Sequence, residues 1–376
     1  METQKQLFNS NAVSAAKACA ILLMVAGHAA IPGYLQDYLY MMRMPVFFIM
    51  SGYCFKMKYL DDAKTFIKRR FTGIWWPYVK WGLFFLVLHN VLFHLNIYND
   101  VYGYKGTTSH LYTWQEFLKN GVKTLCFANS EQLLGGFWFL KVLFWASLLG
   151  YVCIKYLRKF EISGGVVLII LFVSAYWNIK VLGLGLLPCP LMATFFFLFG
   201  HAWRENEERG GFMTRFYALG QTGRVVVIVL LAAAVKGFEM IIGPTSMLTI
   251  TFGNAAFYMC GALCGTMMVY FVCCRIVSNP NSMVTGFLTF TGRHTFEVLT
   301  WHFLCFKLVS VLIISIYGLV PERLATFPVI STAVLRADGI DVAWTFWWVV
   351  YLIVGAGIPI LWQYVRFRMG KEKRRY

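Results

Sequence analysis

Charged residues are scarce in this chain, and acidic ones are the scarcer kind. Only 14% of the 376 residues are Asp, Glu, Lys or Arg, and 17 acidic residues stand against 34 basic ones. A soluble domain carries about 25% charged residues. Because 59% of the residues are hydrophobic and the mean hydropathy is +0.62, the composition excludes an ordinary soluble protein. We predict an all-α, polytopic bundle of membrane-spanning helices.

Several catalytic signatures are also missing. The sequence contains no Walker A motif, no GxSxG, no HExxH and no Rossmann glycine pattern. These absences argue against an ATP-driven pump, a serine hydrolase and a zinc protease. The ten cysteines are scattered and form neither a CxxC pair nor a metal-binding spacing with histidine. We interpret them as small buried hydrophobic residues and expect no metal.

The net charge of +17 has an uneven distribution. In a soluble chain this charge would suggest a nucleic-acid partner. Here most basic residues form short clusters between apolar runs, which is the positive-inside pattern of membrane proteins. Residues 56–70 hold six cations in 15 residues, and the tail, residues 366–376, holds six more. We therefore expect no nucleic acid, membrane lipids as neighbours, and both termini in the cytoplasm.

About ten apolar stretches are expected to cross the membrane within a single domain, residues 1–376, and this number is fixed only to within one. The longest polar stretches, residues 96–134 and 318–341, are predicted to be external loops, the first with an amphipathic helix near residues 114–127. The second span should be interrupted at Pro45 and at Ser51-Gly52. The expected spans are 11–31, 38–55, 75–95, 136–156, 166–182, 186–203, 224–242, 247–276, about 297–316 and 342–364.

Two ionisable residues lie inside the first apolar stretch. Lys17 and His28 are 11 residues apart, which in an α-helix is three turns plus about 20°, and about 16 Å along the axis. They therefore share one face, and an ionisable residue within a membrane helix is by default a candidate for function. A neutral imidazole can take a proton from a hydroxyl group. The alternative is a histidine that only satisfies local hydrogen bonds.

Further candidates lie in the segment GRHTFEVLTWH, residues 292–302. Arg293 and Glu297 have the i, i+4 spacing at which helical side chains form ion pairs. Such a pair would either support a site or only stabilise the helix. His302 points about 140° away from Glu297 on a helix, and the alternative to a functional role is a hydrogen-bonding core residue.

A run of three cations, Lys68, Arg69 and Arg70, precedes the aromatic sequence WWPY. Membrane topology and contact with lipid headgroups explain such a run in many proteins. The alternative is a cytoplasmic site for a phosphate-bearing molecule, because guanidinium groups bind phosphate oxygens in pairs.

These segments together resemble the membrane-bound acyltransferase 3 family, and particularly its fucose 4-O-acetylase-like branch. The similarity is strongest over about residues 10–80, moderate at 135–145 and 290–303, and weak elsewhere. Arg43 stands where the family often has a histidine before Met-Pro, and Ser14 where it often has an acidic residue. The matching pieces, in family order, are AAKACAILLMVAGHA, MPVFFIMSGYCF, FIKRRFTGIWWPY, FWFLKVLF and TGRHTFEVLTWH.

The resemblance implies transfer of an acetyl group from cytoplasmic acetyl-CoA to a hydroxyl of a cell-envelope or exported carbohydrate or glycolipid, in a bacterial inner membrane. It implies that His28 is the catalytic histidine, that Lys17 is its basic partner and that Glu297 supports the site. Donor binding then falls to Lys68, Arg69 and Arg70. Acceptor binding is assigned to Arg43, Ser51, Trp138 and His302.

Two other classes of function remain open from the sequence. A secondary transporter or flippase for a sugar-containing or lipid-linked substrate also uses broken helices and intramembrane charges, although no internal repeat is visible. A different membrane acyltransferase, acting on lipid or protein, is the third possibility. The acceptor, the acyl chain length and the oligomeric state are not encoded in any recognisable pattern.

Overall fold

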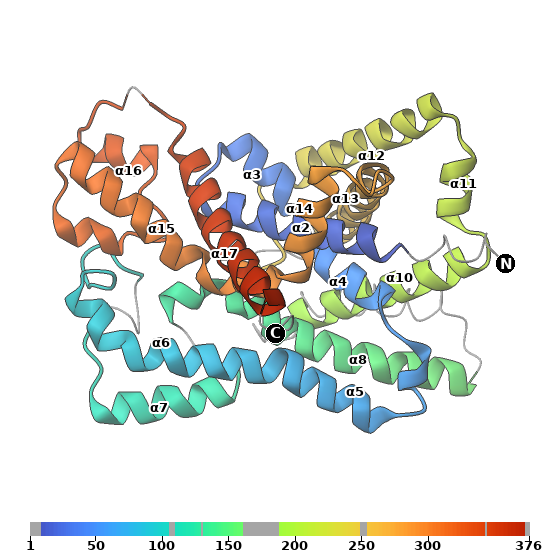
Figure 1. The fold of residues 1–376 in the computed structure, drawn as a ribbon, viewed down its shortest axis with the longest axis horizontal. Coiled ribbons are helices and arrows are strands. Elements are labelled where there is room, and N and C mark those ends of the chain that lie inside the picture. Colours follow the sequence, from blue (N-terminus) through green and yellow to red (C-terminus); the bar gives the residue numbers. More distant parts are fainter. Residues whose placement is uncertain are drawn as a thin grey trace. The chain divides into compact units, whose positions relative to one another are not determined.

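The computed structural model describes residues 9–104, 110–128, 131–160, 188–248, 254–342 and 344–372. Every regular element in these ranges is helical, which confirms the predicted all-α class (Figure 1). Seven stretches among them are long and apolar enough to cross a membrane. They lie at Ser10–His28 (α2), Ala63–His94 (α5 to α6), Gln132–Tyr156 (η3 and α8), Gln221–Ile242 (α12), Ala255–Ile276 (α13), Thr295–Tyr317 (α15) and Trp347–Met369 (within α17, Trp347–Glu372).

The second expected span is not one helix. The chain forms α3 (Gly33–Tyr40) and α4 (Pro45–Tyr53), joined by a turn over residues 41–44. Pro45 is the first residue of α4. Proline has no N–H group, and an N–H at this position would have no carbonyl partner within the helix. The predicted interruption at Pro45 is therefore confirmed, but the one at Ser51-Gly52 is wrong, because both residues lie inside α4.

Two further expected spans stay predictions. The stretch 166–182 lies outside the described residues. The next one corresponds to α10 (Pro188–Glu208), whose last turns carry the charged sequence RENEE. The count of about ten spans and the cytoplasmic position of both termini therefore remain predictions, as does the single domain.

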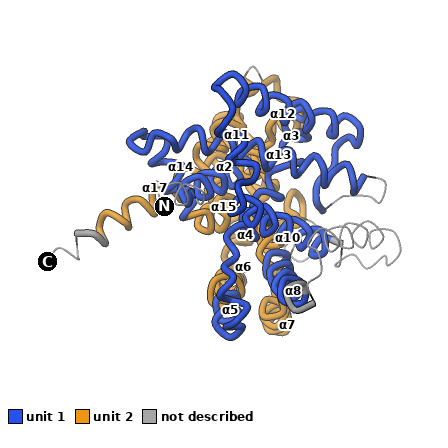
Figure 2. The backbone as a smooth tube through the Cα atoms, turned by 90° about the vertical axis from the view of Figure 1, so that its right-hand side faces the viewer, with its two compact units in different colours: residues 1–23, 33–70, 142–293 blue, residues 24–32, 71–141, 294–376 orange. Residues whose placement is uncertain are grey.

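The chain forms two compact units, each assembled from three separate segments (Figure 2). Unit 1 comprises residues 1–23, 33–70 and 142–293, and unit 2 comprises residues 24–32, 71–141 and 294–376. Helix α2 contributes its first part to unit 1 and its last turns to unit 2.

Unit 1 is held together by close backbone contact and aromatic packing. Helices α4 and α10 approach so closely that a Cβ added at Gly52 would lie 1.7 Å from the Phe197 carbonyl oxygen, and one at Gly200 would lie 1.9 Å from the Ile49 carbonyl oxygen. Small residues permit such contact between membrane helices. The remaining helices of this unit include α5 (Ala63–Arg70), α8 (Trp138–Phe160) from residue 142 onward, α11 (Phe212–Ala218), α13 and α14 (Met283–Arg293).

Unit 2 is built around α15, which packs against α17 and against the short helix η3 (Gln132–Phe137). Lys307 of α15 is buried, and its Nζ donates hydrogen bonds to the carbonyl oxygens of Leu324 (2.8 Å) and Thr326 (2.9 Å). These bonds tie η5 (Pro321–Ala325) and the residues after it to the helix core. The short helix α16 (Thr332–Ala337) follows.

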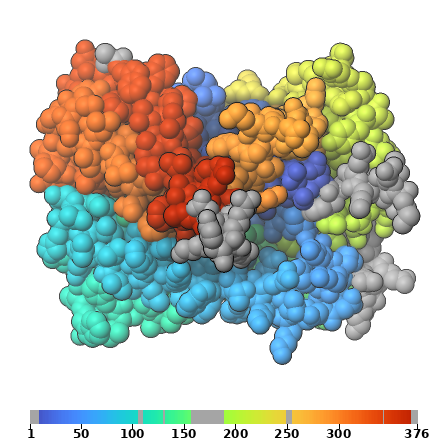
Figure 3. Space-filling view, in the orientation of Figure 1, coloured from blue at the N-terminus to red at the C-terminus, as the bar shows by residue number. Residues whose placement is uncertain are grey.

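The amphipathic helix predicted near residues 114–127 is confirmed as α7 (Trp114–Leu125). It packs against α6 (Trp76–His94), as the cyan and green surfaces at the lower left of Figure 3 show. A capping box begins it: the Thr113 hydroxyl accepts from the Glu116 N–H, and the Glu116 carboxylate accepts from the Thr113 N–H.

Candidate active site

A cavity of about 460 Å³ lies within unit 2. Its volume is in the range of small-molecule sites, about 300–1,000 Å³. Two of the residues predicted from the sequence, His28 and Trp138, line it together with residues from the two predicted external loops and from α15. The full lining is His28, Tyr78, Tyr104, Phe127, Ala128, Glu131, Gln132, Leu134, Gly135, Trp138, Lys141, Phe303 and Phe327.

His28 is the last residue of α2 and is half-buried at the cavity wall. Its imidazole ring lies 5.6 Å from the ring of His302 and 5.0 Å from that of Phe303, between centroids. The helix ends here because the chain turns at Ala29 and Ala30, the latter with a φ of 58°. The structure therefore places the predicted catalytic histidine at a helix end that opens onto a cavity.

His302 is fully buried on α15, and its hydrogen bonds define its tautomer. Nδ1 lies 3.0 Å from the carbonyl oxygens of Val298 and of Leu299. A carbonyl oxygen can only accept, so Nδ1 carries the proton and Nε2 is an acceptor. Within the described part of the chain, Nε2 is buried and has no hydrogen-bond partner. His302 thus places an acceptor nitrogen on a ring that packs beside His28.

Glu131 and His89 form a buried pair that our sequence reasoning missed. The distance from His89 Nδ1 to Glu131 Oε2 is 3.2 Å, and the two side chains are 0% and 2% exposed. Glu131 also lines the cavity. A signal was present, because His89 lies in the middle of an expected span, and an ionisable residue there is a candidate for function.

Lys17, Arg43 and Ser51 lie in unit 1. Lys17 is half-buried on α2, and Ser51 is half-buried on α4. Arg43 is buried in the turn between α3 and α4, with its guanidinium 4.2 Å from the centre of the Tyr40 ring. In the described part of the chain its Nη1 has no hydrogen-bond partner. The roles predicted for these three residues stay predictions.

The three cations predicted to bind the donor end helix α5. Lys68 and Arg69 are exposed, and Arg69 Nη1 donates to the Tyr59 hydroxyl at 2.9 Å. Arg70 is half-buried with its guanidinium 4.9 Å from the centre of the Phe66 ring, and its Nε has no partner among the described residues. Phe66 belongs to an aromatic core, so the helix that carries these cations is fixed from one side.

The expected i, i+4 pair of Arg293 and Glu297 is wrong, because the helix breaks between them. Arg293 ends α14, Glu297 lies in the first turn of α15, and His294 between them has non-helical angles (φ −120°, ψ 29°). The guanidinium of Arg293 instead donates to Asn11 Oδ1 at 3.4 Å. Glu297 is half-buried, and its predicted support of the site stays a prediction.

The fold and this site define a multi-pass membrane protein that presents a histidine to a cavity of small-molecule size. The acyltransferase 3 family model, described as an acyltransferase domain, matches residues 10–366, and the chain belongs to this family. No curated protein and no solved structure matches the chain. Membership establishes a membrane acyltransferase and confirms the resemblance at the level of the family.

Proposed function

We propose that this membrane acyltransferase moves an acetyl group from acetyl-CoA to a hydroxyl of a cell-envelope or exported carbohydrate. The observation that carries the proposal is His28, which lines a cavity of about 460 Å³ within the family's acyltransferase domain. The fucose 4-O-acetylase-like branch, the bacterial inner membrane and a lipid-linked form of the acceptor belong to the same proposal.

In this scheme the neutral imidazole of His28 accepts the proton of the acceptor hydroxyl. The hydroxyl oxygen then forms a bond to the carbonyl carbon of the thioester, and the carbon–sulfur bond breaks. The imidazolium returns its proton to the leaving thiolate, so the products are the acetyl ester and free CoA. Lys17 and Glu297 support the charge of the reacting groups, and His302, Arg43, Ser51 and Trp138 position the acceptor.

The donor binds through its phosphates at Lys68, Arg69 and Arg70. Two observations support this assignment. Lys68 and Arg69 are solvent-exposed on one short helix, and Arg70 has a buried Nε without a partner in the described part of the chain. Guanidinium groups suit phosphate because their N–H groups form paired, charge-assisted hydrogen bonds.

The proposal is tested with purified protein, acetyl-CoA and an extract of cell-envelope glycans, by following release of free CoA thiol and appearance of acetyl ester. Both products should form in equal amounts, and only when the glycan is present. A transporter or flippase, the other class that broken helices such as α3 and α4 favour, should neither bind acetyl-CoA nor release thiol. Absence of binding and of transfer would contradict the proposal.

A further inference from the structure

The cavity has a second polar group, built independently of His28. We propose that Glu131 is the specificity-determining residue that accepts hydrogen bonds from hydroxyls of a sugar ring, and that His89 is the positioning residue behind it. The inference rests on the proposed function and deepens it, because it names the side chain that recognises the acceptor. Glu131 is 4% exposed and lines the cavity.

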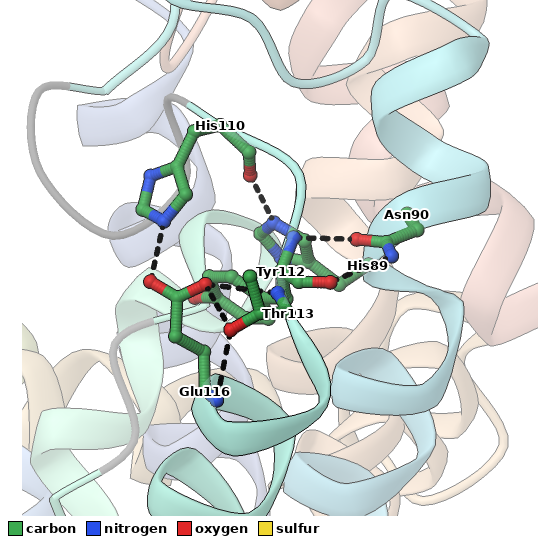
Figure 4. A network of polar contacts seen from close by, with 6 residues as sticks. All are labelled: His89, Asn90, His110, Tyr112, Thr113 and Glu116. Atoms are coloured by element: carbon green, nitrogen blue, oxygen red, sulfur yellow. Dashed lines mark hydrogen bonds and ion pairs between the residues drawn. The ribbon is translucent and has the colours of Figure 1, made fainter.

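The hydrogen bonds of His89 fix how many protons the pair holds. Its Nε2 lies 3.0 Å from the His110 carbonyl oxygen, which can only accept, so Nε2 carries a hydrogen (Figure 4). Its Nδ1 lies 3.2 Å from Glu131 Oε2, and a contact between two bare acceptors would be repulsive. One further proton therefore lies between Nδ1 and the carboxyl group. The hydrogen bond between the two side chains offsets part of the cost of burying both of them.

The pair is also held rigidly. The His89 ring stacks on Tyr112 with centroids 3.5 Å apart and planes 5° from parallel, and the Tyr98 ring lies 5.1 Å away on the same histidine. Asn90 fixes Tyr112 in turn: its amide nitrogen donates to the Tyr112 carbonyl oxygen (3.1 Å), and its oxygen accepts from the Tyr112 N–H (2.8 Å). Figure 4 shows the hydrogen bonds among His89, Asn90, His110 and Tyr112. Oε2 of Glu131 is thus held against a fixed imidazole, which keeps the carboxyl group in place at the cavity wall.

The chemistry of the wall indicates a sugar ring as the occupant. Six aromatic side chains line the cavity, and aromatic faces pack well against the C–H faces of a ring. A wholly apolar alcohol offers no O–H donor beyond the reacting one to the Glu131 carboxyl group, whose two oxygens can accept several hydrogen bonds. A ring with apolar faces and hydroxyls at its edges satisfies both requirements. The aromatic residues are Tyr78, Tyr104, Phe127, Trp138, Phe303 and Phe327.

The test uses methyl hexopyranosides of glucose, galactose and mannose, each with its set of monodeoxy analogues. Binding to the purified full-length protein is measured by calorimetry without donor, and transfer is measured separately with acetyl-CoA. For the sugar that binds best, we expect loss of one hydroxyl to weaken binding about 10- to 100-fold in the wild type, as for a hydrogen bond to a charged group. Glu131→Gln keeps the shape of the side chain but removes the carboxyl group. In this variant, loss of the same sugar hydroxyl should weaken binding less than about tenfold.

The matched control is Glu116→Gln. Glu116 also pairs with a histidine, His110, at 2.7 Å, but this pair is exposed and does not line the cavity. This control should discriminate between the sugars as the wild type does. His89→Gln should bind the sugar more weakly than the wild type, and its discrimination against the deoxy analogue should fall as it does in Glu131→Gln. Thermal melting identifies variants that have lost the fold.

Two results would overturn the inference. In the first, no hexoside binds; in the second, loss of the hydroxyl weakens binding to Glu131→Gln as much as binding to the wild type. The separate binding measurement distinguishes this failure from failure of the proposed function. In another outcome, the wild type and His28→Ala both bind sugar through Glu131 while neither transfers acetyl groups. That result would support the sugar-recognition site and contradict the proposed transfer reaction.

Discussion

The imidazole rings of His28 and His302 lie side by side, with centroids 5.6 Å apart and planes inclined by 31°. One ring lines the cavity, and the other is fully buried on α15 with its Nδ1 proton committed to backbone carbonyl oxygens. The Nε2 of His302 is an acceptor without a hydrogen-bond partner among the described residues, and it belongs to the ring that packs beside His28. We predict that this acceptor nitrogen supports His28 during the reaction.

Replacing His302 by phenylalanine removes the Nε2 acceptor beside His28, and kcat should fall about tenfold, the value of one hydrogen bond to a charged group that forms only when His28 takes up the proton. The phenyl ring keeps the packing against Phe303, which lies 4.0 Å from the His302 ring, so the melting temperature should change little. The matched control is His94→Phe, at the exposed end of α6. An unchanged kcat in His302→Phe would reduce this residue to a packing role.

Arg70→Ala should raise the KM for acetyl-CoA about tenfold to a hundredfold, because it removes charge-assisted hydrogen bonds to phosphate. The acceptor KM should stay the same. Lys64→Ala is the control, since Lys64 is an exposed cation on the same helix but lies outside the predicted run. Equal effects of the two substitutions would show that only the general positive charge of α5 matters.

Gly52→Ala should destabilise the protein by about 1–3 kcal/mol, the usual cost of forcing extra atoms into a packed contact. The new methyl group would meet the backbone carbonyl of Phe197, which cannot move aside as a flexible side chain can. Gly237→Ala on α12 is the control, because nothing lies within 4 Å of its Cβ position. Thermal unfolding in detergent should show a lower midpoint only for Gly52→Ala.

The pKa of Glu116 is lowered to about 2 by its hydrogen bonds, first with the Thr113 backbone N–H and then with His110. A lowered pKa means that the stabilisation is complete above the ordinary value of 4.5 and is lost as the pH falls through about 2. Melting temperatures of the wild type and Glu116→Gln should thus differ by a constant amount between about pH 5 and 8. The difference should shrink in more acidic buffer. A difference that instead grows on acidification would contradict the assigned pairing.

Many of the helices could be predicted because the length of an apolar run can be read from a single stretch of sequence. Residues 224–242, for example, needed nothing beyond their hydropathy to be placed in α12. The break at His294 could not be predicted: the residues on both sides of it have helical patterns, and tertiary packing decides where the chain bends. For the same reason the i, i+4 argument for Arg293 and Glu297 failed.

The sequence predicted residues of the site only where a recognisable motif contains a side chain suited to the chemistry. His28 and Trp138 were named from the sequence and line one cavity. Glu131 was missed because its partner, His89, lies 42 residues earlier in the chain, and no spacing rule connects two residues brought together by a loop. The pair becomes visible only in the folded structure.

The central claim is that His28 takes the proton of the acceptor hydroxyl, and the most direct test is the rate of acetyl transfer by purified His28→Ala. The comparison uses wild type and His94→Ala at equal acetyl-CoA saturation. We predict that His28→Ala loses about 100- to 10,000-fold in kcat, the usual contribution of a general base, and that His94→Ala retains full activity. Wild-type kcat in folded His28→Ala would contradict the account.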